Sequence, residues 1–241
     1  MSKVVCIVQA RMGSSRLPGK VLMDIGGKPS IDLLYDRLSK ASKLDEIVFA
    51  TSDLEKDDVL ANHLKSRGYF LFRGSEQDVL ARYAAAAREF DANIIVRVTG
   101  DCPLIDAKLI DELVEGFLAN DVDHYSNVRP PTYPHGMDAE VFSREALEMA
   151  DKEAGNDMRE HVTTYIHTHD KFAKLNHAID TDHSKLRLTL DEPEDLEAIR
   201  LVYEKFAPEI HMTWQDIVSL VDEQEIVLPN SHLGRAAESK G

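Results

Sequence analysis

Residues 4–20 read VVCIVQARMGSSRLPGK, an apolar run followed at once by a loop of small and basic residues. The apolar run, residues 4–8, predicts a buried strand. The loop carries three cations, Arg11, Arg16 and Lys20, among glycines and serines that let backbone N–H groups approach an anion. Since the 241-residue chain has a net charge of −15, cations concentrated in one loop indicate a small, highly charged anion such as a nucleoside triphosphate.

Beyond this loop, apolar runs alternate with amphipathic stretches as far as residue 119. The alternation predicts an α/β fold with three layers, α/β/α, built on a mostly parallel, Rossmann-like sheet. Ligands of such sheets bind outside the carboxyl ends of the strands, so we expect the loop 9–20, Ser52-Asp53 and Gly100-Asp101 to meet there. The predicted strands are 4–8, 46–51, 69–72 and 94–98, and the predicted helices are 30–42, 54–67 (capped near Asp53), 77–90 and 107–119.

The pattern becomes irregular beyond residue 129. Residues 129–136 hold three prolines and a glycine, which indicates a loop. We predict one domain over residues 1–230, with a small inserted subdomain at about 129–185 and a flexible tail at 231–241. The strands or extended runs predicted in this half are 123–127, 139–142, 172–179 and 186–190, and the helices are 144–152, 158–169, 193–206 and 213–221.

Composition excludes several classes of partner. The acidic charge balance argues against nucleic-acid binding, which requires a basic surface. No apolar run approaches the roughly 20 residues of a membrane-spanning helix, and two widely separated cysteines suit a reducing cytosol. We therefore expect a cytoplasmic protein with no membrane partner. The spacing of His161, His167 and His169 argues against a zinc site.

Each candidate site residue has a purely structural alternative. The loop 9–20 lacks both G-x-x-x-x-G-K-[ST] and G-x-G-x-x-G, so it is either a phosphate-binding loop or a surface turn at Pro18-Gly19. Asp101 is either a turn residue or a hard oxygen ligand for Mg²⁺. Ser75, with Asp78 three residues later, resembles a helix capping box as much as a ligand contact.

Asp191 is predicted to lie just outside the start of a helix. Pro193 suits the first helical position, so Glu192 takes the cap and the Asp191 carboxylate is free to point into a cleft. We also expect Arg16 and Lys20 to be exposed cations whose replacement leaves stability nearly unchanged.

Two stretches, 11–20 (RMGSSRLPGK) and 98–106 (VTGDCPLID), resemble the cytidylyltransferases that activate acidic sugars. That family includes the 3-deoxy-manno-octulosonate and acylneuraminate enzymes, and the most similar branch is the spore coat polysaccharide biosynthesis type. The resemblance implies a glycosyltransferase-A-like fold, with CTP bound by the first loop and Mg²⁺ held by aspartates. Further stretches that carry it are 72–80 (FRGSEQDVL), 159–163 (REHVT) and 188–196 (LTLDEPEDL).

The resemblance, together with the loop chemistry, assigns residues to roles. The expected catalytic residues are Arg11, Arg16, Lys20 and Asp101, and the expected Mg²⁺ ligands are Asp101 and Asp191. The expected acceptor-binding residues are His135, Asp138 and Glu140, although relatives carry Asp where His135 stands. The expected nucleotide-binding residues are Gln9, Ala10, Arg11, Gly13, Ser14, Ser15, Lys20, Asp53, Arg73, Gly74, Ser75, Thr99 and Gly100.

These residues predict a Mg²⁺-dependent cytidylyltransferase. It would transfer CMP from CTP to a sugar or sugar-acid acceptor and release pyrophosphate, in surface polysaccharide or glycoconjugate biosynthesis. One alternative is a nucleotidyltransferase for a sugar-1-phosphate or another small phosphorylated acceptor; another is a nucleotide-sugar-binding protein or glycosyltransferase on the same fold. The resemblance also implies a homodimer with a contact in residues 129–185.

Overall fold

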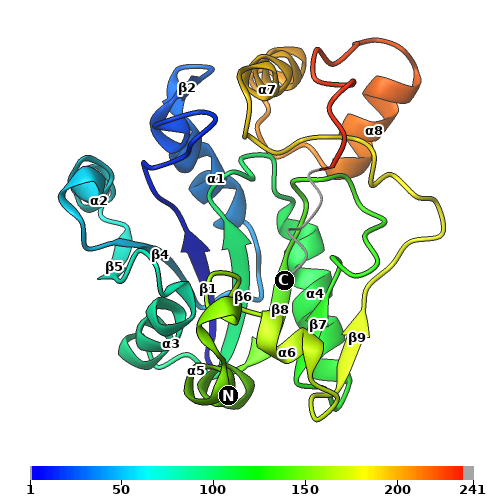
Figure 1. Cartoon of the computed structure of the whole chain (residues 1–241). Helices are drawn as coiled ribbons and strands as arrows, with labels where there is room; N and C mark the ends of the chain where they lie inside the picture. The colour runs from blue at the N-terminus through cyan, green and yellow to red at the C-terminus, as the bar shows by residue number, and fades with distance from the viewer. Residues whose placement is uncertain (1, 236–241) are drawn as a thin grey trace.

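The computed structural model describes residues 2–235 and contains a seven-stranded sheet in the order β5-β4-β1-β6-β8-β7-β9 (Figure 1). β1, β4, β5 and β6 run parallel to one another, which confirms the predicted α/β class with a mostly parallel sheet. The strands are β1 (Val4–Gln9), β4 (Glu46–Ser52), β5 (Phe70–Gly74), β6 (Ile94–Thr99), β7 (His124–Ser126), β8 (Glu140–Ser143) and β9 (Lys174–Asn176).

The strand order reverses at β1. The chain first builds outward from β1 through β4 to β5, then returns to place β6 on the other side of β1. The loop after β1 and the turn after β6 therefore follow the carboxyl ends of two adjacent strands at this reversal, which is where open α/β sheets bind ligands. The first basic loop and Asp101 both follow strands at this point.

Residues 129–185 contribute to the same sheet. β8 pairs antiparallel with β6, bringing Glu140 opposite Arg97, and β7 pairs with both β8 and β9. Of the tail expected at 231–241, residues 231–235 are described: the Gly234 carbonyl accepts from Arg187 and Arg235 pairs with Asp138. Residues 236–241 lie outside the described part of the chain.

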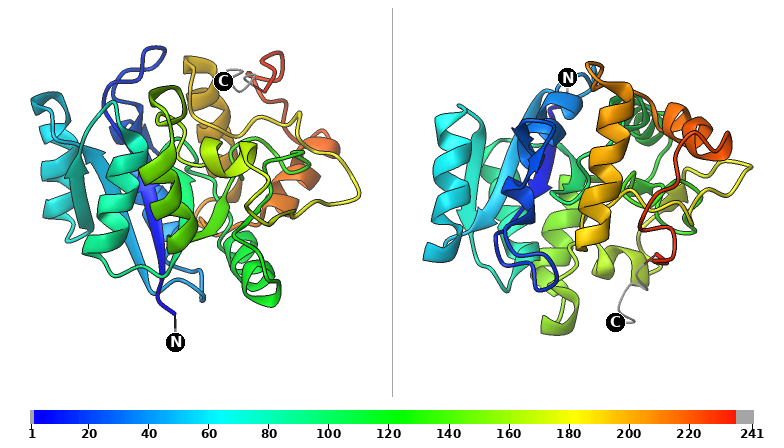
Figure 2. Two further views of the ribbon diagram at one scale, coloured as in Figure 1. Left: turned by 60° about the horizontal axis from the view of Figure 1, so that its bottom comes forward. Right: turned by 90° about the horizontal axis from the view of Figure 1, so that it is seen from above.

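Helices cover both faces of the sheet, and Figure 2 shows the three layers from two further directions. One core joins Cys6, Val8 and Phe49 to α1, α2, α4, α7 and α8; the other joins Val5 and Ile7 to α3, α5 and α6. Alternate residues of β1 thus enter opposite cores, as strand geometry requires. The helices are α1 (Ser30–Leu38), α2 (Asp58–Ser66), α3 (Val79–Glu89), α4 (Ala107–Ala119), α5 (Arg144–Glu153), α6 (Thr164–Thr168), α7 (Pro193–Phe206) and α8 (Trp214–Asp222). Within residues 2–235, none of them is long and apolar enough to cross a membrane.

Local capping corrects two predicted helix starts. The helix predicted from residue 54 begins with a 3-10 turn, and α2 itself starts at Asp58, so Asp53 is no cap. The N-cap of α3 is Asp78, which accepts from the Ala81 N–H, whereas Ser75 accepts from the Asp78 N–H one turn earlier.

One further prediction was wrong, and one element was missed. The helix predicted at 158–169 is only α6, preceded by a 3-10 turn at Asn156–Met158. The run 186–190, predicted to be extended, contributes one isolated bridge, Arg187 to His135. A small hairpin of β2 (Asp24–Ile25) and β3 (Lys28–Pro29) was not predicted. Its turn, Gly26-Gly27, takes positive φ values of 61° and 90°, which glycine tolerates.

A buried arginine attaches α1 to the segment before α8. Arg37 is 2% exposed, and its guanidinium donates to carbonyl oxygens of Leu104, Ile105, Ile210 and Met212. A buried charge is tolerable only when hydrogen bonds replace its hydration, and here backbone dipoles do so.

We predict that Arg37→Met lowers the free energy of unfolding by at least about 3 kcal/mol, because it leaves several buried carbonyl groups without donors. Urea titration at pH 7 measures the loss. The matched control is Arg144→Met, which removes an exposed pair with Glu148 at 2.9 Å and should cost no more than about 0.5 kcal/mol. Equal losses in the two variants would contradict the role of Arg37.

Candidate active site

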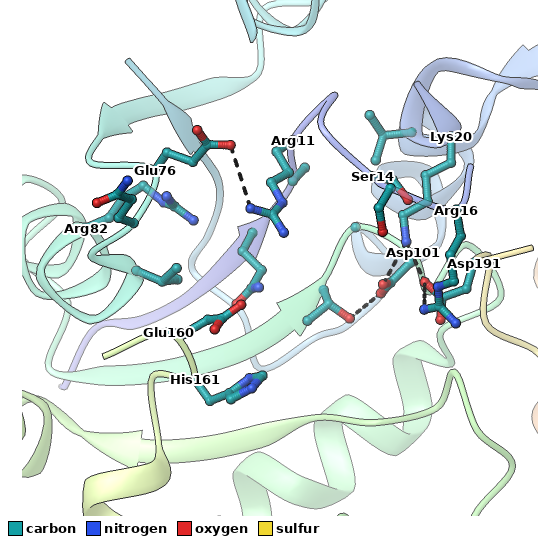
Figure 3. Close-up of a pocket in the computed structure, with 18 residues that line it drawn as sticks. Arg11, Ser14, Arg16, Lys20, Glu76, Arg82, Asp101, Glu160, His161 and Asp191 are labelled. Carbon is teal, nitrogen blue, oxygen red and sulfur yellow. Dashed lines mark hydrogen bonds and ion pairs between the residues drawn. The ribbon is translucent and has the colours of Figure 1, made fainter. Parts of the chain in front are cut away.

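A polar cavity of about 610 Å³ opens at the carboxyl ends of β1 and β6 (Figure 3). The loop after β1 forms one wall, and the turn after β6 with Asp191 closes one end. The cavity is lined by Gln9, Ala10, Arg11, Ser14, Ser15, Arg16, Lys20, Val21, Glu76, Gln77, Val79, Arg82, Thr99, Gly100, Asp101, Glu160, His161 and Asp191.

Lys20 lies between the two aspartates that were predicted to bind Mg²⁺. Its Nζ is 3.0 Å from Asp101 Oδ2 and 2.8 Å from Asp191 Oδ1. Lys20 is only 9% exposed, so the expectation of an exposed cation was wrong for this residue: the two carboxylates draw its stem inward. Burial lowers the pKa of Lys20, but the two aspartates outweigh this and raise the pKa above its ordinary value.

Local structure presents both aspartates to the same point. Thr99 Oγ1 donates to Asp101 Oδ1 at 2.5 Å, while the backbone carbonyl of Asp101 accepts from the Leu190 N–H at 2.8 Å. Burial by itself would raise the pKa of Asp101, yet Lys20 and the Thr99 hydroxyl lower it to about 2. The carboxylate is therefore ionised at neutral pH.

The start of α7 holds Asp191 outside the helix, as predicted. Glu192 is the N-cap and Pro193 the first helical residue, and Asp195 completes a capping box. Asp195 Oδ2 also accepts from the Asp191 N–H at 2.9 Å, and the Arg187 guanidinium binds both oxygens of Asp195. These contacts anchor the backbone and leave the Asp191 side chain to face Lys20.

The other two cations of the loop are more exposed. Arg16 pairs with Glu192 at 3.0 Å and Asp191 at 3.3 Å, with 46% of its side chain exposed, and Arg11 lies 3.7 Å from Glu76 with 51% exposed. The loop backbone itself is held firmly, because the Met12 N–H donates to Asp57 at 2.6 Å. A fixed loop with exposed guanidinium groups suits a phosphate chain, whose oxygens need several donors.

Gln9 has a fixed orientation in the cavity wall. Arg97 donates to Gln9 Oε1 at 3.3 Å, and a guanidinium has no acceptor, so the amide nitrogen of Gln9 is the end that remains for a ligand. Arg97 in turn binds Glu140 across the β6–β8 pair.

Glu140, predicted to bind the acceptor, lies instead inside the protein. Its carboxylate is 3% exposed and does not line the cavity. Besides Arg97 it binds Thr163 Oγ1 at 3.1 Å and the Nε2 atoms of His124 and His167, each at 2.9 Å. Burial by itself would raise the pKa of Glu140, but Arg97 and these donors hold it well below its ordinary value.

His124, Glu140 and His167 form a compact group of the kind that binds metals, with ligand atoms within 4.8 Å of one another. The Arg97 guanidinium already neutralises the carboxylate, and a divalent cation beside it would face like-charge repulsion in a dry site. Burial lowers the pKa of His124, so its neutral ring donates to Glu140. We therefore assign this cluster a structural role.

Several other predicted residues lie away from the cavity. The Arg73 guanidinium donates to the Ser52 and Leu54 carbonyls and pairs with Asp58 at 2.7 Å, so it joins β4 to α2. Asp138 pairs with Arg235 at 2.5 Å and lies 3.9 Å from His135. The predicted residues that do not line the cavity are Gly13, Asp53, Arg73, Gly74, Ser75, His135, Asp138 and Glu140.

The sequence interpretation missed residues from two segments. Glu76 and Gln77 enter from the segment before α3 and Arg82 from its first turn, while Glu160 and His161 face the loop 9–20 from the segment before α6 (Figure 3). Four of these residues belong to stretches that carried the family resemblance, which was a usable signal. Arg82 had none: it is 5% exposed, and its Nε has no partner within the described residues.

Comparisons with known proteins agree with this geometry. Residues 5–217 match the family profile described as Cytidylyltransferase. The chain is 32% identical over 231 residues to the spore coat polysaccharide biosynthesis protein SpsF of Bacillus subtilis, over 92% of this chain and 95% of that protein. A cytidylyltransferase of Leptospira borgpetersenii has a similar structure, with a TM-score of 0.91 and 33% identity over 95% of this chain and 98% of that one. CMP:2-keto-3-deoxy-manno-octonic acid synthetase, solved with CTP, shares the fold with a TM-score of 0.65 and 20% identity over 85% and 99% of the two chains.

We predict that Glu140→Gln lowers the free energy of unfolding at pH 7 by about 3 kcal/mol or more, because the buried Arg97 loses its counter-charge. The native pKa of Glu140 is depressed, so its stabilisation is complete above the ordinary value of 4.5 and is lost as the pH falls below it. The difference between wild type and variant should shrink accordingly in urea titrations between pH 7 and pH 3. Glu148→Gln, at an exposed pair, is the control, and a constant difference across this range would refute the assignment.

Proposed function

The chain belongs to the cytidylyltransferase family, and on that premise we propose that it transfers CMP from CTP to a sugar or sugar-acid acceptor with release of pyrophosphate. The resemblance noticed in the sequence is confirmed, and the chain is a nucleotidyltransferase of the EC 2.7.7 class. One observation carries the finer proposal: cations of the loop 9–20 and the carboxylates of Asp101 and Asp191 meet in one cavity at the reversal of strand order.

The cation-rich loop is the proposed triphosphate site. Arg11 and Arg16 are exposed enough to turn toward phosphate oxygens, and Ser14 and Ser15 line the same wall. Arg82 adds a buried guanidinium whose pKa is lowered, chiefly by burial, and whose Nε lacks a partner among the described residues. A phosphate oxygen of CTP beside Arg82 would accept a hydrogen bond and so replace the hydration that the buried guanidinium has lost.

The residues present fit Mg²⁺. Asp101 and Asp191 direct carboxylate oxygens at one cation, the Lys20 ammonium. Hard, negatively charged oxygen atoms of this kind are the ligands that Mg²⁺ prefers. When bound, Mg²⁺ supplies neutralisation of phosphate charge and a template for in-line attack. The side chains of Asp101 and Asp191 would hold it.

The chain's own residues position the reactants and spread the charge. Arg11, Arg16 and Lys20 would bind the phosphates and stabilise the negative charge that moves to the leaving pyrophosphate. Gln9 would donate its amide hydrogens to an oxygen of the bound substrate. We place the acceptor on the side of Glu160 and His161, because these residues face the loop 9–20 across the cavity. A sugar-type acceptor is supported by the spore coat polysaccharide relative and by the fold shared with the keto-deoxy-octonic acid enzyme.

We propose a homodimer that works in the cytoplasm. β9 is a three-residue edge strand within residues 129–185, and Leu175 on it is 45% exposed, which is consistent with a covered edge in a dimer. The two cysteines are free and buried, as suits a reducing compartment.

We predict that Asp101→Asn and Asp191→Asn each reduce pyrophosphate release by at least about 100-fold, because an amide cannot neutralise a metal ion. The assay measures release from each of the four nucleoside triphosphates against acidic sugars and sugar phosphates, with a Mg²⁺ titration. The double variant should lose little more than either single variant if both side chains serve one ion. Asp36→Asn, at a surface pair with Lys28, is the control.

Wild-type rates for Asp191→Asn at limiting Mg²⁺ would remove Asp191 from the site. Preference for a sugar-1-phosphate would select the alternative acceptor class. Donor hydrolysis without pyrophosphate release would indicate a glycosyltransferase.

For the dimer, we predict a mass by light scattering of twice the 27.1 kDa chain at micromolar concentration. Leu175→Asp should give the monomer mass, because it places a charge on the proposed contact. The matched control is Leu54→Asp. Leu54 is 44% exposed at a position outside the proposed contact, so its replacement should leave the mass unchanged. A monomeric wild type would exclude the dimer.

A further inference from the structure

We propose that Lys20 is an internal placeholder cation, which holds Asp101 and Asp191 until nucleotide phosphates draw it away, so that divalent metal binding depends on nucleotide binding. This inference rests on the proposed function of the same cavity. It adds an order to the binding events, and it gives Lys20 a role before the nucleotide arrives.

The geometry of Lys20 differs from that of the other two loop cations. Arg11 and Arg16 have about half of their side chains exposed, whereas the Lys20 side chain is 11% exposed. Its ammonium makes hydrogen bonds of 3.0 and 2.8 Å with the two aspartates, which lie together at one end of the cavity (Figure 3). In the structure, the Lys20 ammonium, which is expected to bind phosphate, thus binds the two carboxylates that are expected to bind metal.

The ammonium and a divalent ion cannot share these oxygens. Mg²⁺ binds carboxylate oxygen at about 2.1 Å, so an ion held by Asp101 Oδ2 and Asp191 Oδ1 takes the position that the ammonium now fills. The two positive charges would also repel each other at such a short separation. Metal entry therefore requires Lys20 to leave.

Only the side chain of Lys20 has to move. Its backbone is fixed in a 3-10 turn, Lys20–Leu22, which begins after Gly19 at φ 74°. The four-carbon stem is flexible and its ammonium is a compact charge, which makes lysine suited to exchanging one anionic partner for another. Triphosphate oxygens bound by the same loop would offer that second partner, with Ser14, Ser15 and Arg16 on the adjacent wall.

The exchange couples the two ligands thermodynamically. Without nucleotide, metal must compete with Lys20 for the aspartates; with nucleotide, the lysine has another anion and the aspartates are released. By linkage, the metal must then strengthen nucleotide binding by the same factor. Replacing a residue that merely supported the fold would weaken the binding of both ligands. Replacing a placeholder strengthens metal binding and weakens nucleotide binding.

The direct test measures Mn²⁺ binding to the nucleotide-free protein. The electron paramagnetic resonance signal of free Mn²⁺ reports how much of the ion remains unbound. Lys20→Met should bind Mn²⁺ about tenfold more tightly than wild type, a factor within the usual range of coupling between sites. Calorimetry with CTP in EDTA should show the reverse, with about tenfold weaker CTP binding by Lys20→Met. Lys20→Arg keeps a cation and should retain the weak Mn²⁺ binding of wild type. Lys28→Met removes a lysine that pairs with Asp36 outside the cavity and should match wild type in both assays.

Equal Mn²⁺ affinity for wild type and Lys20→Met would overturn the inference. Circular dichroism checks that Lys20→Met is folded, and Lys20→Gln is the second neutral variant if it is not. Adding Asp101→Asn to Lys20→Met should abolish the gained Mn²⁺ binding. If the gain persists, the metal binds away from Asp101, which overturns both the proposed metal site and the placeholder role of Lys20; pyrophosphate release by the wild-type protein tests the proposed function separately.

Discussion

The ion pairs of Lys20 with Asp101 and Asp191 are the contact on which the cavity depends. One ammonium joins the loop after β1, the turn after β6 and the segment before α7. Without it, Asp101 and Asp191 would lose the one cation that both of them contact within the described residues. The chain therefore supplies its own cation to both carboxylates.

Two glycines set how closely these segments approach. A Cβ on Gly100 would lie 2.9 Å from the Cβ of Ala10, so the two loops could not pack as they do. Gly136 has a φ of 107°, and a Cβ there would lie 2.6 Å from the Leu188 carbonyl. Leu188 and Leu190 in turn hydrogen-bond to His135 and Asp101, which places Asp191 at the cavity. The position of Asp191 at the cavity thus depends on backbone contacts that carry no charge.

Behind the cavity, a buried polar network ties the antiparallel extension of the sheet to its parallel half. Glu140 on β8 accepts hydrogen bonds from four side chains. One of these, Arg97 on β6, also donates to Gln9, which links the network to the cavity wall. Such a network is costly to break because each buried group depends on the others. It makes the extension part of the site's architecture, even though Glu140 itself does not line the cavity. The 0.91 TM-score against a cytidylyltransferase over nearly the whole chain shows that this extension is shared, not peculiar to this protein.

The sequence by itself determined the mostly parallel sheet, the helices α4 and α7, the position of Asp191 outside a helix, and the place of the cation-rich loop after β1. These follow from local information, since hydrophobic spacing, a proline at a helix start and clustered cations all act within a few residues. Only the tertiary structure decided that Lys20 is buried between two aspartates, that Arg73 and Glu140 serve the fold, and that Arg82, Glu160 and His161 reach the cavity. Lys20 and Asp191 are 171 positions apart, and their meeting depends on how the whole sheet is ordered. A carboxylate in a buried strand and one in a cleft look alike in sequence, because burial and hydrogen-bond partners are properties of the packed chain.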